Sequence, residues 1–147
     1  MPSPIRFSNQ VFIRRPPEDV FAYVADFSRL PTWNYAIRST DQVTPGPVGL
    51  GTTFRQVRSI PAVAEEEFEV TAWEPGRRVA ITGDFGPFSG TLAYRVEPTP
   101  QGTLLTNDAE LAARGVLGVV GRVAGPRLKA AIAENLEVLR AALEAGS

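Results

Sequence analysis

The chain has 147 residues, and 15 Lys and Arg against 16 Asp and Glu give it a formal net charge of −1. A balanced charge provides no broad attraction for phosphate backbones, so we expect no nucleic-acid partner. The sequence contains neither Cys nor His, which excludes disulfides, thiolate nucleophiles, His-dependent triads and the common zinc sites. We therefore expect no metal ion and no cofactor.

The N-terminal residues Met1–Arg6 lack the apolar segment of a signal peptide, and the apolar stretches elsewhere are too short to cross a bilayer. These features predict a cytoplasmic protein without membrane insertion. The length suits one domain over residues 1–147, acting as a monomer or weak homodimer.

The first elements can be placed from periodicity. Residues 5–14 alternate apolar and polar side chains, which predicts a strand. Residues 17–25 carry apolar side chains at helical spacing after two prolines, which predicts a short helix. A second short helix should end near Trp33, with Asp26 and Ser28 as alternative capping residues.

From Ala36 onward the chain is typical of consecutive strands separated by turns. Five strands are predicted at residues 52–60, 64–73, 77–85, 88–96 and 103–111. The links between them are short, so neighbouring strands should form hairpins in an antiparallel meander. With the N-terminal strand and the segment after Ala36, the sheet should have about seven strands.

The turns also predict how the strands pair. The expected pairs are Arg58 with Glu66, Val70 with Ile81, Ala72 with Val79, Ile81 with Gly90, and Leu92 with Asn107. Paired residues share a face of the sheet, so these pairs propagate one apolar face opposite a charged one. On this parity Ala72 points to the apolar face and Trp73 to the outer face.

An amphipathic helix should cover the apolar face. From Leu128 to Leu143, apolar side chains recur at spacings of four, four, three and four, which predicts a helix over residues 116–143. Gly83 and Gly90 lie near the middle of the covered face, where missing side chains would leave room for a ligand. The alternative is that both glycines only curve the sheet.

Several local motifs match those of a known superfamily. They are PEDVF at 17–21, LPTW at 30–33, VGLGTTF at 48–54, FEVTAWEPGRRV at 68–79 and GPFSGT at 86–91. With the order of elements, they resemble the START-like helix-grip (SRPBCC) superfamily, and most closely its polyketide cyclase/dehydrase branch. The resemblance implies an α+β helix-grip fold, in which a curved antiparallel sheet wraps a long C-terminal helix. It also implies a cavity for lipids, hormones, quinones or polyketide intermediates.

The ligand-site residues are expected on the apolar face, on the helix that covers it and, by resemblance, at a mouth formed by Trp33 and Tyr35. Asn107 is included because a buried amide without a partner costs about 1–3 kcal/mol and therefore needs one. The full set is Trp33, Tyr35, Phe54, Gln56, Phe68, Ile81, Gly83, Phe88, Gly90, Leu92, Tyr94, Asn107, Leu128 and Ile132.

Three functions remain open from the sequence. The first is binding of a small apolar ligand that is lipid-, polyketide- or aromatic-like. The second is a cyclase or dehydratase, whose catalytic candidates without His are Tyr94, Arg58 and Glu66. Arg58 and Glu66 either form an ion pair at the pocket rim or a partly exposed cross-strand pair. The third is a protein-interaction module similar to co-chaperone relatives, which requires a large exposed apolar patch.

Overall fold

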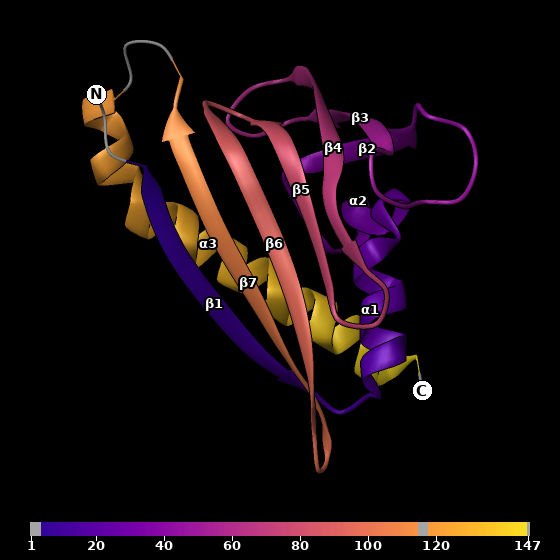
Figure 1. The fold of residues 1–147 in the computed structure, drawn as a ribbon. Coiled ribbons are helices and arrows are strands. Elements are labelled where there is room, and N and C mark those ends of the chain that lie inside the picture. The colour runs from indigo at the N-terminus through magenta and orange to yellow at the C-terminus, as the bar shows by residue number, and fades with distance from the viewer. Residues whose placement is uncertain (1–3, 115–117, 147) are drawn as a thin grey trace.

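The computed structural model describes residues 4–114 and 118–146. It shows a curved antiparallel sheet of seven strands with a long helix across its concave face (Figure 1). The predicted α+β helix-grip class is thus confirmed. In chain order the elements are β1 Ile5–Ile13, α1 Pro17–Ala25, a 3₁₀ turn η1 Phe27–Arg29, α2 Leu30–Trp33, β2 Ile37–Gln42, β3 Thr53–Arg58, β4 Ala64–Glu74, β5 Arg78–Phe85, β6 Phe88–Thr99, β7 Gly102–Ala113 and α3 Gly118–Ala145.

The strand order is β1-β7-β6-β5-β4-β3-β2. Strands β2 to β7 thus form the predicted meander, and the N-terminal strand β1 lies at the edge next to β7. Helix α3 runs along the sheet beneath β1, β7 and β6 (Figure 1). Helix α2 packs near β2, whereas α1 lies beside the C-terminal end of α3 and contacts β6 and β7. Pro126 lies inside α3, which continues past it as one helix and is not split there. Residues 116 and 117 of the predicted helix lie outside the described residues.

Helix α1 begins where the sequence predicts. Pro17 occupies the first turn, where its missing N–H group costs no hydrogen bond, and Glu18 and Asp19 place negative charge at the helix N-terminus. Arg15 forms an ion pair of 2.7 Å with Asp19. The apolar stripe of the helix, which includes Phe21, is buried against the sheet.

Three of the predicted pairings are wrong by two residues. Glu66 pairs with Gln56 rather than Arg58, Ile81 with Leu92 rather than Gly90, and Tyr94 rather than Leu92 with Asn107. The reason is that the turns are not those implied by the predicted strand ends. Between the strands predicted at 88–96 and 103–111, for example, pairing continues until Thr99 pairs with Gly102. Side chains alternate with a period of two, so a slip of two leaves each residue on its predicted face.

A β-bulge in β4 corrects the parity of one segment. Val70 pairs with Ile81 as predicted, but the register shifts between Val70 and Ala72, and Trp73 then pairs with Val79. The extra residue reverses which side chains face inward. Trp73 therefore packs against the core, with its ring 5.4 Å from that of Phe21, and was wrongly predicted on the outer face.

Phenylalanine rings fill the end of the core beneath η1. The ring centre of Phe27 lies 5.4 Å from that of Phe54 and 5.5 Å from that of Phe68. The rings of Phe54 and Phe68 stack on each other with their centres 5.2 Å apart. Phe85 extends the cluster, with its ring centre 6.3 Å from Phe68. This aromatic cluster closes one end of the space between sheet and helices, and it packs η1 against β3 and β4.

Gly83 and Gly90 lie where the backbone of a neighbouring strand approaches closely. A Cβ atom at Gly83 would overlap the Glu67 carbonyl oxygen and lie 2.7 Å from the Cα atom of Phe68. At Gly90, where φ is +153°, a Cβ atom would overlap the Glu110 carbonyl oxygen. The backbones of neighbouring strands occupy the positions that side chains would take. Of the two roles considered, these glycines have the structural one.

Gly83→Ala should therefore destabilise the protein by about 2 kcal/mol, because the added methyl group forces the strand away from β4. The matched control is Gly49→Ala, whose Cβ atom would meet no heavy atom within 4 Å. Urea unfolding of both variants measures the difference. Equal stabilities for the two variants would show that the close strand approach at Gly83 does not constrain the sheet.

Candidate ligand-binding site

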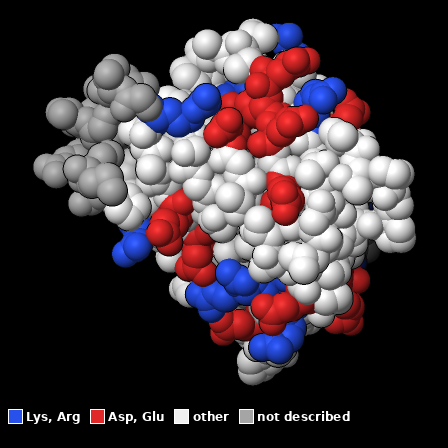
Figure 2. Space-filling view, turned by 45° about the horizontal axis from the view of Figure 1, so that its top comes forward, with Lys and Arg blue, Asp and Glu red and all other residues white. Residues whose placement is uncertain are grey.

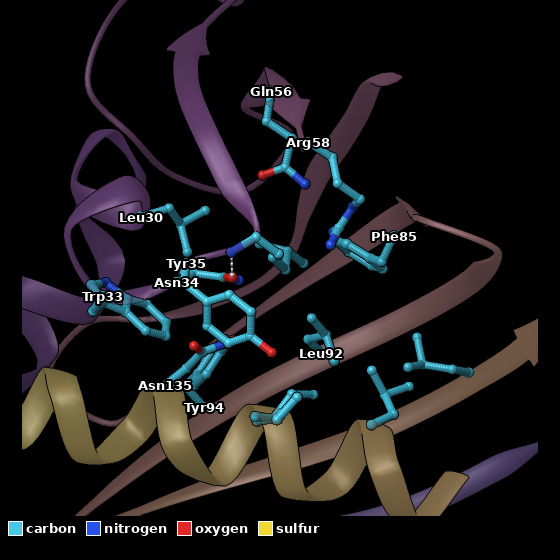
Figure 3. A pocket seen from close by; sticks show the side chains of 16 residues that line it. Leu30, Trp33, Asn34, Tyr35, Gln56, Arg58, Phe85, Leu92, Tyr94 and Asn135 are labelled. Carbon is cyan, nitrogen blue, oxygen red and sulfur yellow. Dashed lines mark hydrogen bonds between the residues drawn. The ribbon is translucent and has the colours of Figure 1, made fainter. Parts of the chain in front are cut away.

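A cavity of about 100 Å³ lies between the sheet and α3, at the end where α2 packs. Its walls come from α2 and the following loop, from β3, from the centre of the sheet and from α3 (Figure 3). Tyr35 lies at its mouth with 56% of its surface exposed. The lining residues are Leu30, Trp33, Asn34, Tyr35, Ala36, Gln56, Arg58, Ile81, Phe85, Leu92, Tyr94, Leu111, Leu128, Ala131, Ile132 and Asn135.

Helix α3 supplies the floor of the cavity. Leu128, Ala131, Ile132 and Asn135 recur at spacings of three, one and three, which places them on one side of the helix. Figure 3 shows Asn135 and Tyr94 close together above this helix, below Tyr35. The floor is thus apolar except for one amide.

The roof of the cavity depends on a buried carboxylate. Glu66, whose side chain is 3% exposed, accepts hydrogen bonds from Gln56 Nε2 at 2.9 Å and from the Gly86 backbone N–H at 2.6 Å. Arg58 Nε lies 3.0 Å from one carboxylate oxygen and 2.9 Å from the other. The expected Arg58–Glu66 ion pair is therefore formed, and it is buried rather than partly exposed, since the Arg58 side chain is only 13% exposed.

This network makes the roof electrically neutral and rigid. A carboxylate removed from water is tolerated only where charged and hydrogen-bonding partners compensate for its lost hydration. Here Arg58 supplies the opposite charge, and Gln56 and Gly86 supply further donors. Because these groups belong to β3, to β4 and to the turn between β5 and β6, the network also joins three parts of the sheet.

Three polar atoms of lining residues are buried without a hydrogen-bond partner among the described residues. They are Trp33 Nε1 on α2, Gln56 Oε1 in the roof and Asn135 Oδ1 in the floor. An unsatisfied buried polar atom costs about 1–3 kcal/mol, and such atoms mark places where water or a ligand binds. Burial raises the pKa of Tyr94, so its hydroxyl stays protonated at neutral pH and can donate a hydrogen bond.

Eight of the fourteen residues predicted to bind ligand line this cavity. They are Trp33, Tyr35, Gln56, Ile81, Leu92, Tyr94, Leu128 and Ile132. Arg58, considered as a catalytic candidate, lines it as well, whereas Glu66 is not among the lining residues and holds Gln56 and Arg58 in place.

The other six predicted residues are placed elsewhere. Phe54 and Phe68 belong to the aromatic cluster, and Gly83 and Gly90 lie where strands approach closely. Phe88 is buried opposite Phe85 at the β5–β6 turn. Asn107 is fully buried in β7, and its Nδ2 atom lies 3.5 Å from the Ala93 carbonyl oxygen. None of the six is among the cavity's lining residues.

Seven lining residues were not expected from the sequence: Leu30, Asn34, Ala36, Phe85, Leu111, Ala131 and Asn135. Most are ordinary apolar residues whose role depends on the three-dimensional packing. Asn135 carried a signal, because it is a polar residue one turn after Ile132 on the apolar side of the predicted helix. A polar residue inside an apolar stripe is a candidate for a site.

No group of three or more Asp or Glu side chains that could hold a metal ion occurs within residues 4–114 and 118–146. The helices of that same part of the chain include none with the length and hydropathy needed to cross a bilayer.

Replacing Arg58 by Met should destabilise the protein by about 3 kcal/mol, because it leaves the buried Glu66 carboxylate without its compensating charge. Arg55→Met is the matched control on the same strand: Arg55 pairs with Glu67 at 3.1 Å, but their side chains are 54% and 63% exposed. We expect that control to lose less than about 1 kcal/mol. Chemical denaturation of the two variants tests this, and similar losses would contradict a special role for the buried pair.

The comparisons with known proteins agree with this structure. Residues 4–144 match the family model described as polyketide cyclase / dehydrase and lipid transport. An uncharacterized Mycobacterium tuberculosis protein, Rv2574, is 34% identical over 110 residues, which are 71% of this chain and 64% of that relative's length. A second uncharacterized protein of that species, Rv1546, is 27% identical over 123 residues, 82% of this chain and 86% of the relative.

Solved structures share the fold. The di-domain ARO/CYC protein StfQ from the steffimycin biosynthetic pathway superposes with a TM-score of 0.79 at 16% identity, covering 99% of this chain and 53% of that one. The Polyketide_cyc-like protein Cgl2372 from Corynebacterium glutamicum has a TM-score of 0.64 at 25% identity, covering 98% and 94%. The resemblance inferred from the sequence motifs is confirmed: this chain belongs to the polyketide cyclase/dehydrase and lipid transport family.

Proposed function

We propose that this protein binds a small, largely apolar ligand in the cavity between its sheet and α3. The observation that carries the proposal is the presence of three unpartnered buried polar atoms in an otherwise mainly apolar lining: Trp33 Nε1, Gln56 Oε1 and Asn135 Oδ1. Apolar walls with a few convergent polar groups are the usual composition of small-molecule sites. We further propose that a single domain carries out this binding in the cytoplasm, as a monomer or weak homodimer.

The size of the cavity favours an aromatic-like ligand over a lipid. An apolar cavity of about 150 Å³ holds benzene, whereas drug-sized ligands occupy pockets of about 300–1,000 Å³. A cavity of about 100 Å³ therefore suits a single ring after small side-chain movements. The exposed side chain of Tyr35 is placed to make such a movement at the mouth. A long acyl chain or a fused polyketide would require a much larger displacement of α3.

A cyclase or dehydratase activity is the second candidate, supported by the family and by one feature of the site. Tyr94 places a protonated hydroxyl in the wall, where it can donate a hydrogen bond to a substrate carbonyl and stabilise developing negative charge on its oxygen. Glu66 is less suited to act as a base because Gln56, Arg58 and Gly86 all donate to its carboxylate. If the enzyme hypothesis holds, Tyr94→Phe should slow turnover of a cyclisable poly-β-ketone model by at least tenfold, measured by product formation.

A protein-interaction module receives less support from the surface. Trp73 packs inward against Phe21 and therefore does not contribute to an apolar patch on the outer face. Exposed apolar side chains such as Leu50, Val63 and Val138 lie on separate segments of the chain. Figure 2 shows acidic and basic side chains next to each other in the upper and lower parts of the visible face, with mostly uncharged residues between them.

A variant that fills the cavity should abolish ligand binding. Ala131→Leu projects a larger side chain from α3 into the lining, and we expect the affinity for toluene to fall at least tenfold in isothermal titration calorimetry. Ala130→Leu adds the same atoms at the neighbouring, exposed position and should bind toluene like the unmodified protein. Thermal unfolding verifies that both variants are folded. Unchanged toluene affinity in Ala131→Leu would contradict binding in this cavity.

A further inference from the structure

The orientation of the Gln56 amide is set by its neighbour. A carboxylate has only acceptor atoms, so the group that Gln56 presents to Glu66 must be its donor, Nε2, and the 2.9 Å hydrogen bond has this arrangement. The carbonyl oxygen Oε1 must then point the other way. Figure 3 shows the amide at the roof of the cavity with its nitrogen on the Arg58 side and its oxygen on the opposite side.

Gln56 Oε1 can only accept a hydrogen bond, and its orientation is fixed. Gln56 is only 2% exposed, and Oε1 has no hydrogen-bond partner among the described residues. Rotation of the amide by half a turn would bring Oε1 against the carboxylate of Glu66 and lose the existing hydrogen bond. The roof therefore offers a ligand an acceptor and cannot exchange it for a donor.

Asn135 does not share this constraint. It also has a buried, unpartnered oxygen in the lining, but no hydrogen bond from a described residue fixes its amide. Asn135 can turn either its oxygen or its nitrogen toward a ligand, so it accommodates donors and acceptors alike. Of the two amides, only Gln56 therefore imposes a preference for ligands that donate. The third unpartnered atom, Trp33 Nε1, can only donate, and a phenolic hydroxyl can both donate to Gln56 and accept a hydrogen bond.

The charge balance of the roof adds a second restriction. Arg58 is the cationic side chain in the lining, and Glu66 already neutralises it at 2.9 Å. An anionic ligand would bring a third charge into a neutral, mostly apolar space and would face the Gln56 oxygen. Such a charge is costly to bury without a free counter-ion.

We propose that the cavity selects an uncharged ring that carries a hydrogen-bond donor, such as a phenolic hydroxyl or an aromatic amine. Gln56 is the specificity-determining residue, and Glu66 is a positioning residue that acts through Gln56. This inference rests on the proposed binding function and adds the chemical class of the ligand.

The test compares ligands of similar size on the unmodified protein. Phenol and aniline donate a hydrogen bond, toluene has no polar group, anisole only accepts, and benzoate is charged. We expect phenol and aniline to bind at least about tenfold more tightly than toluene and anisole in calorimetry, the contribution of one hydrogen bond to an otherwise unsatisfied buried acceptor. Benzoate should bind more weakly than phenol. Equal affinities for phenol and toluene would overturn the inference, whereas failure of all five compounds to bind would overturn the proposed function itself.

Two near-isosteric variants test whether the preference for phenol over toluene comes from Gln56. Gln56→Leu should lower the ratio of phenol to toluene affinity to about one, whereas Asn135→Leu should keep phenol the tighter ligand. A phenol preference that survives in Gln56→Leu would overturn the role assigned to Gln56.

Glu66→Gln tests the positioning role. A neutral amide can accept or donate, so it releases Gln56 to rotate, and the ratio of phenol to anisole affinity should fall because anisole binds better. A loss of stability alone would not change this ratio. An unchanged ratio in a folded Glu66→Gln protein would overturn the positioning role of Glu66. The ligand series and Gln56→Leu test the ligand class and the role of Gln56 independently of the Glu66→Gln variant.

Discussion

The cavity depends on one buried interaction, the carboxylate of Glu66 held by Arg58, Gln56 and the backbone of Gly86. An ionised group at that depth is stable only when its partners remain in place, so the network fixes the positions of the strands that carry them. It also determines the polarity of the wall. Arg58 is neutralised, and Gln56 must direct its oxygen away from the carboxylate. On the function that we propose, a mostly structural interaction thus decides which ligand chemistry the cavity accepts.

Much of the fold could be predicted because the period of the apolar residues is insensitive to small errors in register. Gln56, Leu92 and Tyr94 keep their predicted face although their pairings are displaced by two residues. Trp73 shows the limit of this reasoning. The bulge after Val70 changes parity, and no feature of a single sequence distinguishes a bulged strand of that kind from a regular one.

The site was harder to predict than the fold, for two physical reasons. First, a glycine in a strand can make room either for a ligand or for the backbone of a neighbouring strand, and the sequence does not distinguish the two. At Gly83 and Gly90 the missing side chains admit neighbouring backbone. Secondly, Asn107 was selected because it is a buried amide with an incomplete set of partners. The structure confirms that its oxygen is unpartnered but places it in β7, outside the cavity lining. Which buried polar groups share one space depends on the packing of α2 and α3, which strand periodicity does not determine.

The space that remains is small because the aromatic cluster fills the neighbouring end of the core, from Phe27 to Phe85. What distinguishes it is a fixed acceptor in an uncharged wall, opposite an adaptable amide on α3. The most direct test is a crystal structure of the protein soaked in phenol. We predict that the phenol ring lies between Leu92 and Ile132, with its oxygen about 2.7 Å from Gln56 Oε1. Phenol with its oxygen turned away from Gln56, or a cavity that stays empty at saturating phenol, would contradict this prediction.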